Sequence, residues 1–444
     1  MLVGVASGGH GVAAADLPSE ARAALERAVG FFTKRVATQG GYLWRYSADL
    51  SQREGEGQAT ATQIWVQPPG TPAVGEALLG AYRATGDERY LSAAVAAAEA
   101  LIWGQLACGG WDYKIDFDPI ESRRWYRRRD LLAGLKREQD QRYRGTMDDD
   151  TTQSATRFVI EVALVTGQPR HREAAEYALD YLLEAQFDNG AWPQWYPLAE
   201  EGYSRFYTFN DGAINDCIAT MLKAWHAFGD ERYLRSAAKG GEFIIASQLD
   251  EPQSGWAQQY DWDMKPAWAR KFEPPAVCSK VTSRNIRTLV DLYLQTGVEE
   301  FLAPIPAAIQ WLEASAIGPD RWARFYELGT NRPLYFTRDY QLVYTAEDLP
   351  THYSFQGSYG VSASIRFYHE VLEKGREAYL AERDAPMTEE TKQRIRAGME
   401  ERVAGIVAAL DEQGRWIDAD GWISCQTFIR NVGQLSAYLA LCGK

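Results

Sequence analysis

One pattern recurs along the chain and limits the folds that it can adopt. A turn with glycine is followed by a stretch of helical period, a glutamine, and then glycine and tryptophan. Copies of this pattern end at Trp44, Trp111, Trp192, Trp256, Trp322 and Trp416. The intervals between the clearest copies are long enough for two helices with their loops. Helix pairs repeated in this way bury their apolar faces against their neighbours, in a solenoid or a closed ring.

The apolar residues between the turns follow the period of a helix. In the stretch 173–183 they recur at intervals of three and four residues, which predicts a helix with one buried face. Strand-like alternation is rare across the chain. We therefore predict an all-α fold, an α/α toroid of repeated helix pairs that form a partial or closed ring. The Gly-Trp ends and the functional loops are expected to gather on one face of that ring.

The chain contains no linker rich in proline or serine. We therefore expect a single toroid domain over residues 20–444, after a disordered or signal-like segment over 1–19. The stretch 112–147 is the best candidate for a non-helical insert. The apolar start and the alanine run 13–15 resemble the end of a secretory signal, although the basic first region of such a signal is missing. On this basis we expect a secreted or periplasmic protein.

Charge and hydropathy exclude two classes of partner. The formal net charge is −13 at pH 7, which argues against nucleic acid as a ligand. No stretch approaches the roughly 18–20 consecutive apolar residues that a membrane-spanning helix needs.

The five cysteines are odd in number and scattered, so a disulfide framework is not expected. We expect a monomer that binds neither nucleic acid nor membrane.

Two acidic motifs precede helix-period stretches in consecutive repeats. Three aspartates occupy positions 148–150, and Asp211 follows Asn210 before the next such stretch. Adjacent carboxylates repel one another, and a hard cation such as Ca²⁺, which takes ~6–8 oxygen ligands, relieves that repulsion. The alternative is that each group only caps its helix and interacts with the helix dipole. Two acidic helix starts that meet at one mouth of the ring would form a metal site.

Basic residues gather in three segments beside these motifs. The segment 265–275 combines three cations with aromatic rings and a proline pair, and the segment 322–333 together with Arg338 after it offers three arginines. The run 123–144 has nine Lys and Arg against three Asp and Glu. Because arginine forks onto carboxylates, these segments suit an acidic polysaccharide. The alternative for each segment is a set of solvated charges and ion pairs that tie loops together.

Taken together, these segments resemble the family 10 polysaccharide lyases, a family of bacterial pectate lyases. The resemblance extends over about 96–345. The motifs follow the family order at 109–111, 147–152, 190–198, 208–211, 265–275 and 322–333. Two positions depart from the family pattern, because Asp149 stands where asparagine is expected and Val281 where an acidic residue is expected.

This resemblance implies an α/α toroid, a bound Ca²⁺ and cleavage of polygalacturonate by anti β-elimination across the C4–C5 bond. By resemblance, Asp148 and Asp211 help to hold the calcium ion, and Arg270 is the catalytic residue. The substrate-binding residues that it implies are Lys265, Asn210, Arg332 and Arg338. A guanidinium normally keeps its proton, with a pKa above ~12. The base is therefore either Arg270, with a lowered pKa, or Lys265.

Three other interpretations fit parts of the pattern. A glycoside hydrolase that acts on a polysaccharide or oligosaccharide containing uronic acid would need two carboxylates ~5–9.5 Å apart and no metal, and Asp148 with Asp211 would supply them. A terpene cyclase shares the Gly-Trp repeats and the acidic run, but the neighbouring cations disfavour a cavity for a hydrocarbon. A non-catalytic binding protein would keep the ring and tolerate the loss of Arg270.

Overall fold

The computed structural model describes residues 17–443. Residues 1–16 of the predicted signal-like segment lie outside the described residues, and 17–19 begin helix α1 (Leu17–Phe31). The chain divides into two compact units. We call residues 66–68 and 101–385 the large unit, and the other described residues the small unit. The single domain expected over 20–444 stays a prediction.

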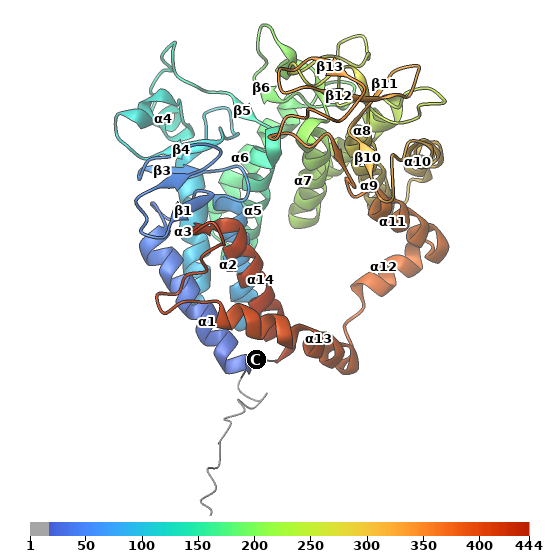
Figure 1. Ribbon diagram of the computed structural model, residues 1–444. Helices are drawn as coiled ribbons and strands as arrows, with labels where there is room; N and C mark the ends of the chain where they lie inside the picture. The colour runs from blue at the N-terminus through green and yellow to red at the C-terminus, as the bar shows by residue number, and fades with distance from the viewer. Residues whose placement is uncertain (1–16, 444) are drawn as a thin grey trace, which may run out of the picture. The chain divides into compact units, whose positions relative to one another are not determined.

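Helices build most of both units, and the predicted helix pairs are found in the large unit (Figure 1). The helices of the large unit are α4 (Arg128–Leu132), α5 (Thr151–Thr166), α6 (Pro169–Ala185), α7 (Ala213–Phe228), α8 (Glu231–Ala246), α9 (Ser279–Thr296), α10 (Ile305–Ala314), α11 (Val361–Lys374) and α12 (Arg376–Asp384). Helix α5 packs against α6 and α7 against α8, and α5, α7, α9 and α11 are neighbours in that order.

The small unit and the short helical turns complete the helical structure. The small unit contains α1, the π-helical turn η1 (Phe32–Val36), α2 (Thr71–Thr85), most of α3 (Glu88–Gly104), α13 (Glu389–Ala408) and α14 (Cys425–Leu441). The 3-10 turns of the large unit are η2 (Glu121–Arg124), η3 (Asp148–Asp150), η4 (Tyr203–Arg205), η5 (Asn210–Gly212) and η6 (Glu299–Leu302). In the small unit α14 packs against α1, α2 and α13.

The glycine that opens each copy of the sequence pattern ends the first helix of a pair. Gly167, Gly229 and Gly297 have φ of +63°, +70° and +75°. The amide of each donates to a main-chain carbonyl four residues earlier. Glycine adopts this left-handed conformation without a Cβ clash, so it ends the helix and turns the chain toward the second helix of the pair.

The tryptophan that closes the copy is bonded to the end of the preceding helix in the copies that end at Trp111, Trp192, Trp256, Trp322 and Trp416. The indole nitrogens of Trp111, Trp192 and Trp256 each donate to a carbonyl in the last turn of α3, α6 or α8, at 2.8 or 2.7 Å. Trp322 and Trp416 make the same bond to α10 and α13. Since the last carbonyls of a helix have no partner within it, these bonds explain why tryptophan recurs at this place.

The glutamine of each copy joins its own turn to the next helix pair. Gln105 Nε2 donates to the carbonyls of Gly109, at 2.9 Å, and of Ala174 in α6, at 3.0 Å. Gln186 and Gln248 each make the corresponding two bonds, one within their own turn and one to the following pair. We call these three side chains the glutamine braces. They fix the spacing between successive pairs of the large unit.

The strands are short and connect the helices at their loop ends. They are β1 (Arg45–Ser47), β2 (Arg53–Glu54), β3 (Gln63–Trp65), β4 (Lys114–Asp116), β5 (Gly145–Thr146), β6 (Trp195–Tyr196), β7 (Tyr207–Thr208), β8 (Gln259–Tyr260), β9 (Ala276–Cys278), β10 (Trp322–Ala323), β11 (Phe325–Glu327), β12 (Pro333–Phe336), β13 (Leu342–Val343), β14 (Gln356–Gly357) and β15 (Trp422–Ser424). Strand β5 pairs with β6 and β7 with β8, both antiparallel. The widest sheet has the order β13-β12-β11-β9.

The remaining predictions about the fold concern the insert, the cysteines and the membrane. Residues 112–147 contain α4, η2 and two short strands, so the stretch predicted to be non-helical does hold short helices, whereas residues 315–360 of the large unit contain strands and no helix. All five cysteines are free thiols. Within residues 17–443 the structure contains no helix with the length and apolar character needed to cross a membrane.

Candidate active site

Two neighbouring helices of the large unit begin in the same unusual way. Strand β5 leads into η3 and α5, and β7 leads into η5 and α7. Asp149 and Asp150 have φ of +48° and +59°, and Asp211 and Gly212 have φ of +45° and +81°. Consecutive residues with positive φ are uncommon, and here they turn the chain sharply before each helix. Asp149 is therefore the structural counterpart of Asp211.

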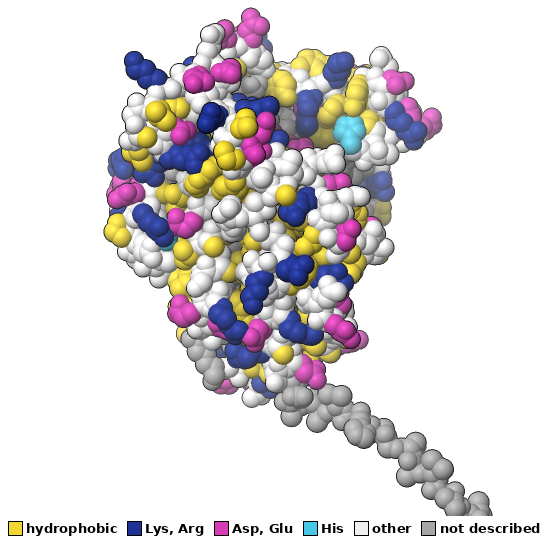
Figure 2. Space-filling view, turned by 90° about the vertical axis from the view of Figure 1, so that its left-hand side faces the viewer, with side chains coloured by type: hydrophobic (Ala, Val, Ile, Leu, Met, Phe, Trp, Pro, Cys, Tyr) yellow, Lys and Arg dark blue, Asp and Glu magenta, His cyan; other side chains and the backbone are white. Residues whose placement is uncertain are grey.

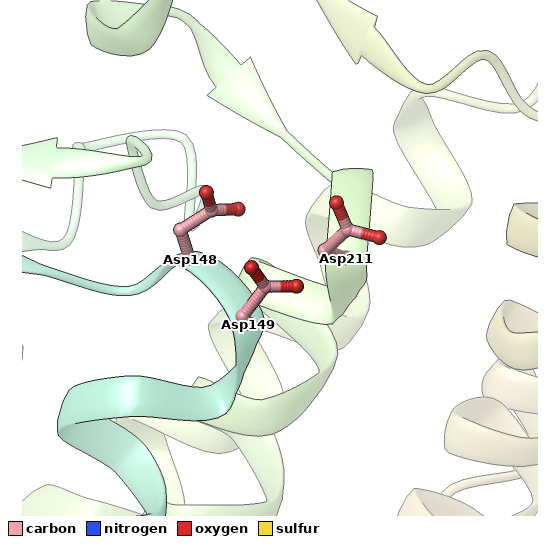
Figure 3. A group of neighbouring side chains, drawn as sticks. All are labelled: Asp148, Asp149 and Asp211. Carbon is pink, nitrogen blue, oxygen red and sulfur yellow. The ribbon is translucent and has the colours of Figure 1, made fainter. Parts of the chain in front are cut away.

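These two helix starts bring three carboxylates together. One oxygen from each of Asp148, Asp149 and Asp211 lies within 4.8 Å of the other two. Figure 3 shows Asp148 and Asp149 at the start of α5 and Asp211 at the start of α7. We call these three residues the acidic cluster. The two acidic helix starts meet as predicted, and Asp149 is a third member that the sequence did not single out.

Asp148 and Asp149 both accept hydrogen bonds from neighbouring side chains. The Tyr113 hydroxyl donates to Asp148 Oδ2 at 2.7 Å, and Gln67 Nε2 donates to Asp149 Oδ2 at 2.8 Å. Burial raises the pKa of Asp148 above its ordinary value. Its Oδ1 is buried and accepts no hydrogen bond from any residue between 17 and 443, so one oxygen of the cluster lacks a partner.

Asp211 also faces three cationic side chains. Lys280 Nζ lies 3.1 Å from Asp211 Oδ1, Arg324 Nη2 lies 3.9 Å from the same oxygen, and Arg270 Nη2 lies 3.9 Å from Oδ2. Burial alone would raise the pKa of Asp211, but Lys280, Arg324 and Arg270 outweigh it and hold the pKa below its ordinary value. Asp211 therefore stands between an acidic half and a basic half of the site.

A buried glutamate fixes Arg270. The side chain of Glu273 is 1% exposed, and its two oxygens accept from Arg270 Nε at 2.8 Å and Nη2 at 2.7 Å. Asn210, Gln258 and Tyr353 also donate to Glu273. The hydrogen bonds from Arg270 to Glu273 raise the pKa of Arg270 above its ordinary value. The guanidinium is therefore charged and held in one orientation beside the acidic cluster.

The acidic cluster fits a divalent cation that prefers oxygen ligands. Two unit charges of like sign 4.8 Å apart repel by about 3 kcal/mol at an effective dielectric constant of about 20. A cation would relieve that repulsion and give Asp148 Oδ1 the partner that it lacks. Carboxylate oxygens are the usual ligands of Ca²⁺. Asp148, Asp149 and Asp211 are thus the residues that would hold it.

Two ion pairs support the helix starts behind the cluster. Arg157 Nη2 lies 2.6 Å from Asp150 Oδ2, and Arg284 Nη2 lies 2.6 Å from Asp216 Oδ1. The Arg284 guanidinium packs against the turn before α7, because a Cβ at Gly212 would lie 1.9 Å from its Nη1. Burial, followed by the charge of Asp150, raises the pKa of Asp216 to about 6. The positions of α5, α7 and α9 are therefore coupled by charge.

The other predicted substrate-binding residues lie apart from the acidic cluster, with one exception. Asn210 precedes Asp211 and donates to Glu273 at 3.3 Å. The side chain of Lys265 is 75% exposed beside Asp263, and that of Arg338 is 70% exposed beside Asp348. Arg332 is exposed and its guanidinium lies 3.5 Å from the ring centroid of Tyr344. The substrate-binding roles of all four residues stay predictions.

Besides Asp149, four further residues of the site were not singled out from the sequence. They are Tyr113, Glu273, Lys280 and Arg324. Arg324 and Glu273 fall inside the predicted basic segments, but the sequence does not distinguish Arg324, which is 5% exposed, from other arginines nearby. Lys280 lies at the start of α9, where the chain departs from the family pattern at Val281. A lysine in the first turn of a predicted helix is the signal that would have found it, since cations are unfavourable there.

The sequence of the large unit matches one known family. Residues 122–321 match the pectic acid lyase family, and this segment contains the acidic cluster together with Arg270, Glu273 and Lys280. No curated protein matches the chain in sequence. The family match therefore comes from the same part of the chain that forms the site.

Solved structures similar to this one include lyases and hydrolases. A family 10 polysaccharide lyase from Cellvibrio cellulosa is 23% identical, over 68% of this chain and 97% of that chain, with a TM-score of 0.50. A mutant of the family 10 lyase from the same organism, in complex with trigalacturonic acid, is 22% identical over 68% and 98%, also with a TM-score of 0.50. A family 76 glycoside hydrolase (mannosidase) from Bacteroides thetaiotaomicron is 11% identical over 96% and 98%, with a TM-score of 0.51.

These structural likenesses bear on the fold, and the family match bears on the activity. The lyase and hydrolase neighbours are α/α toroids, which confirms the predicted fold class. Because the same fold serves both reactions, the fold alone does not decide between them. The match over residues 122–321 favours the lyase, and it confirms the predicted resemblance: this segment of the chain matches the pectic acid lyase family.

Proposed function

We propose that the protein cleaves polygalacturonate by calcium-assisted β-elimination across the C4–C5 bond. The observation that carries this proposal is the position of Asp211, which belongs to the acidic cluster and also faces Arg270, Lys280 and Arg324. A cation held at the acidic cluster would therefore lie next to a carboxylate of the substrate that binds the three basic side chains. The trigalacturonic acid in the Cellvibrio complex supports galacturonan as the substrate.

The chemistry of elimination explains why a site of this kind is needed. The proton at C5 of galacturonate lies next to a carboxylate, and it is very weakly acidic while that carboxylate keeps its full charge. Its removal places further negative charge on the sugar. A calcium ion bound to the acidic cluster would supply positive charge that neutralises the carboxylate and makes the C5 proton more acidic. Arg270, Lys280 and Arg324 would add hydrogen-bond donors and charge on the other side.

Arg270 is the catalytic residue in this proposal, and its charge decides its role. Glu273 raises the pKa of Arg270, so the guanidinium donates hydrogen bonds to the charge that develops on the substrate. To act as the base it must first release a proton, which Glu273 opposes. The alternative base from the sequence, Lys265, has a largely exposed side chain. We therefore assign charge stabilisation to Arg270 and keep the identity of the base as a question for the pH profile.

The experiment that tests the function measures the unsaturated uronate that elimination produces. Purified protein is mixed with polygalacturonate, and the ultraviolet absorbance of the product is followed with calcium and with a chelator. We expect the absorbance to rise only with calcium. Arg270→Ala should abolish the rise. Arg172→Ala is the matched control, because Arg172 is an exposed arginine of α6 paired with Glu176, and it should change nothing.

The result also separates the lyase from the alternative hydrolase. A glycoside hydrolase would release new reducing ends without ultraviolet absorbance and would not respond to the chelator. That outcome would overturn the proposal. A polysaccharide substrate too large to enter a cell also fits the secreted or periplasmic location that we expect for the protein. Detection of the protein in culture medium or periplasmic extract of its source cells would test that location.

A further inference from the structure

A hollow beside the acidic cluster is not used by the mechanism proposed above. It has a volume of about 560 Å³ and lies in the insert 112–147 and at strand β6. The side chains of its lining that matter here are Tyr113, Arg137, Arg142, Tyr143, Arg144 and Trp195. We call it the insert groove. Figure 2 looks onto the side of the molecule with α4 and shows Lys and Arg side chains in its upper part, with acidic and hydrophobic ones between them.

The insert groove is continuous with the acidic cluster. Tyr113 lines the groove, and its hydroxyl donates to Asp148 Oδ2 at 2.7 Å. The ring of Trp195 meets the ring of Tyr113 edge to face, with centroids 5.6 Å apart. Arg144 directly precedes strand β5, which pairs with the strand that carries Trp195. One wall of aromatic rings therefore leads from the cluster into the groove.

The groove contains three arginines that are held in different ways. Arg142 lies 3.5 Å from Asp112, and the guanidinium of Arg137 lies 4.2 Å from the ring centroid of Tyr143. Arg144 is half-buried, and its guanidinium lies 6.0 Å from the ring centroid of Tyr143. Among residues 17–443 no carboxylate forms an ion pair with Arg144. Its charge is thus available to a ligand.

These features fit one residue of an acidic sugar chain. A uronate carries one carboxylate per sugar, and a guanidinium can bind it with two parallel hydrogen bonds. The apolar face of a sugar packs against a flat aromatic ring. A groove with one unpaired arginine and a row of aromatic rings offers both contacts at once. The lining has three arginines against two aspartates, Asp112 and Asp140, so the groove carries a small positive charge although the whole chain has a net charge of −13.

We propose that the insert groove binds a uronate residue of the substrate chain, beyond the residues that flank the bond to be cut. This proposal rests on the proposed function. Arg144 receives the carboxylate, and Trp195 receives the face of the sugar ring. Contacts remote from the reacting atoms add to the stabilisation of the transition state only for substrates long enough to reach them. The groove therefore makes the protein prefer long galacturonan chains to short ones.

The test compares two substrates of different length. The unsaturated product is measured with trigalacturonate and with hexagalacturonate, and the ratio of kcat/KM for the longer over the shorter substrate is taken. We expect Arg144→Gln to lower this ratio roughly tenfold, as the loss of about 1.4 kcal/mol of binding would. Arg144→Lys, which keeps the charge, should restore part of it. Melting temperatures confirm that the variants are folded.

A matched control comes from the same insert. Arg124 is an exposed arginine paired with Glu121 at 2.9 Å, and it does not line the groove. Arg124→Gln removes the same charge and should leave the ratio unchanged. An equal fall in both variants would show a general effect of charge, and an unchanged ratio in Arg144→Gln would show that the groove binds no sugar. Either result overturns the proposal.

A second measurement separates a failure of the groove from a failure of the proposed reaction. If the unaltered protein forms no unsaturated product, the proposed function fails, and the groove is then tested by calorimetric binding of hexagalacturonate. A dissociation constant that rises about tenfold in Arg144→Gln and not in Arg124→Gln would support the groove. Equal dissociation constants in all three proteins, or no binding by any of them, would reject it.

Discussion

The substitution Asp149→Asn isolates the charge of the third member of the acidic cluster. Asparagine tolerates positive φ, so it suits the backbone of Asp149 with its φ of +48°. Its side-chain oxygen can still accept the hydrogen bond from Gln67. The change therefore removes one negative charge and little else. We expect it to stabilise the protein without calcium and to weaken the binding of calcium.

The expected size of each effect follows from the geometry. At 4.8 Å, each like-charge pair repels by about 3 kcal/mol at an effective dielectric constant of about 20. The raised pKa of Asp148 and the three cations around Asp211 reduce this repulsion, and solvent screens it further. The net relief is then about 1 kcal/mol, or ~2 °C in melting temperature. A divalent cation is attracted by the same charge, so its affinity should fall about 10–100-fold.

The assay is thermal unfolding with a chelator and with increasing calcium, together with calorimetric titration of calcium. Asp150→Asn is the matched control, because it removes the same charge one residue further along. Asp150 lies outside the acidic cluster and pairs with Arg157 at 2.6 Å, so its loss should lower the melting temperature with and without calcium. If Asp149→Asn melts lower than the unaltered protein in chelator, or binds calcium as tightly, the cluster is not the calcium site.

Three further substitutions test other parts of the site. Arg270→Lys should lower kcat at least ~100-fold. If the alkaline limb of its pH–rate profile moves toward the pKa of lysine, Arg270 is the base. If the limb does not move, Arg270 stabilises charge. Gly212→Ala should reduce the free energy of unfolding by about 2–3 kcal/mol in denaturant titration, because its Cβ would lie 1.9 Å from Arg284 and its φ is +81°. The raised pKa of Asp216, about 6 against 3.8, means that the folded state holds this proton longer, so the free energy of unfolding should fall by about 2 kcal/mol as the pH rises from 4 to 6. Burial raises the pKa of Asp291 to about 6 as well, so Asp216→Asn should remove part of the slope, and an unchanged slope would show that Asp216 does not contribute to it.

The meeting of Asp148, Asp211 and Arg270 could be predicted from the repeat. Each follows a Gly-Trp turn, and turns of successive helix pairs lie at one end of the pairs. Asp149 was not singled out, because its place depends on two consecutive residues with positive φ. Sequence patterns do not reveal that conformation when the residues are aspartates. In the next repeat Gly212 makes the same turn visible.

The cations of the site were only partly predictable for a different reason. Arg270 and Lys265 share one basic segment, yet only Arg270 is held near Asp211. The difference comes from the short turn that Arg270 forms with Glu273, whose buried carboxylate orients the guanidinium. Charge patterns place such residues in a segment, whereas the direction of each side chain depends on its partner. The direction of Arg324 likewise depends on a partner, because its guanidinium lies over the ring of Tyr353, 4.0 Å from the ring centroid.

The glutamine braces bear on how the specificity of this protein can change. Each brace bonds to main-chain carbonyls, which every amino acid presents. Residues in the loops between braces can therefore be exchanged without loss of the bonds that set the spacing of the helix pairs. A designer who grafts another insert in place of 112–147 would keep the frame by retaining Gln105 and its two acceptors. New substrates would then be reached by loop exchange on an unaltered scaffold.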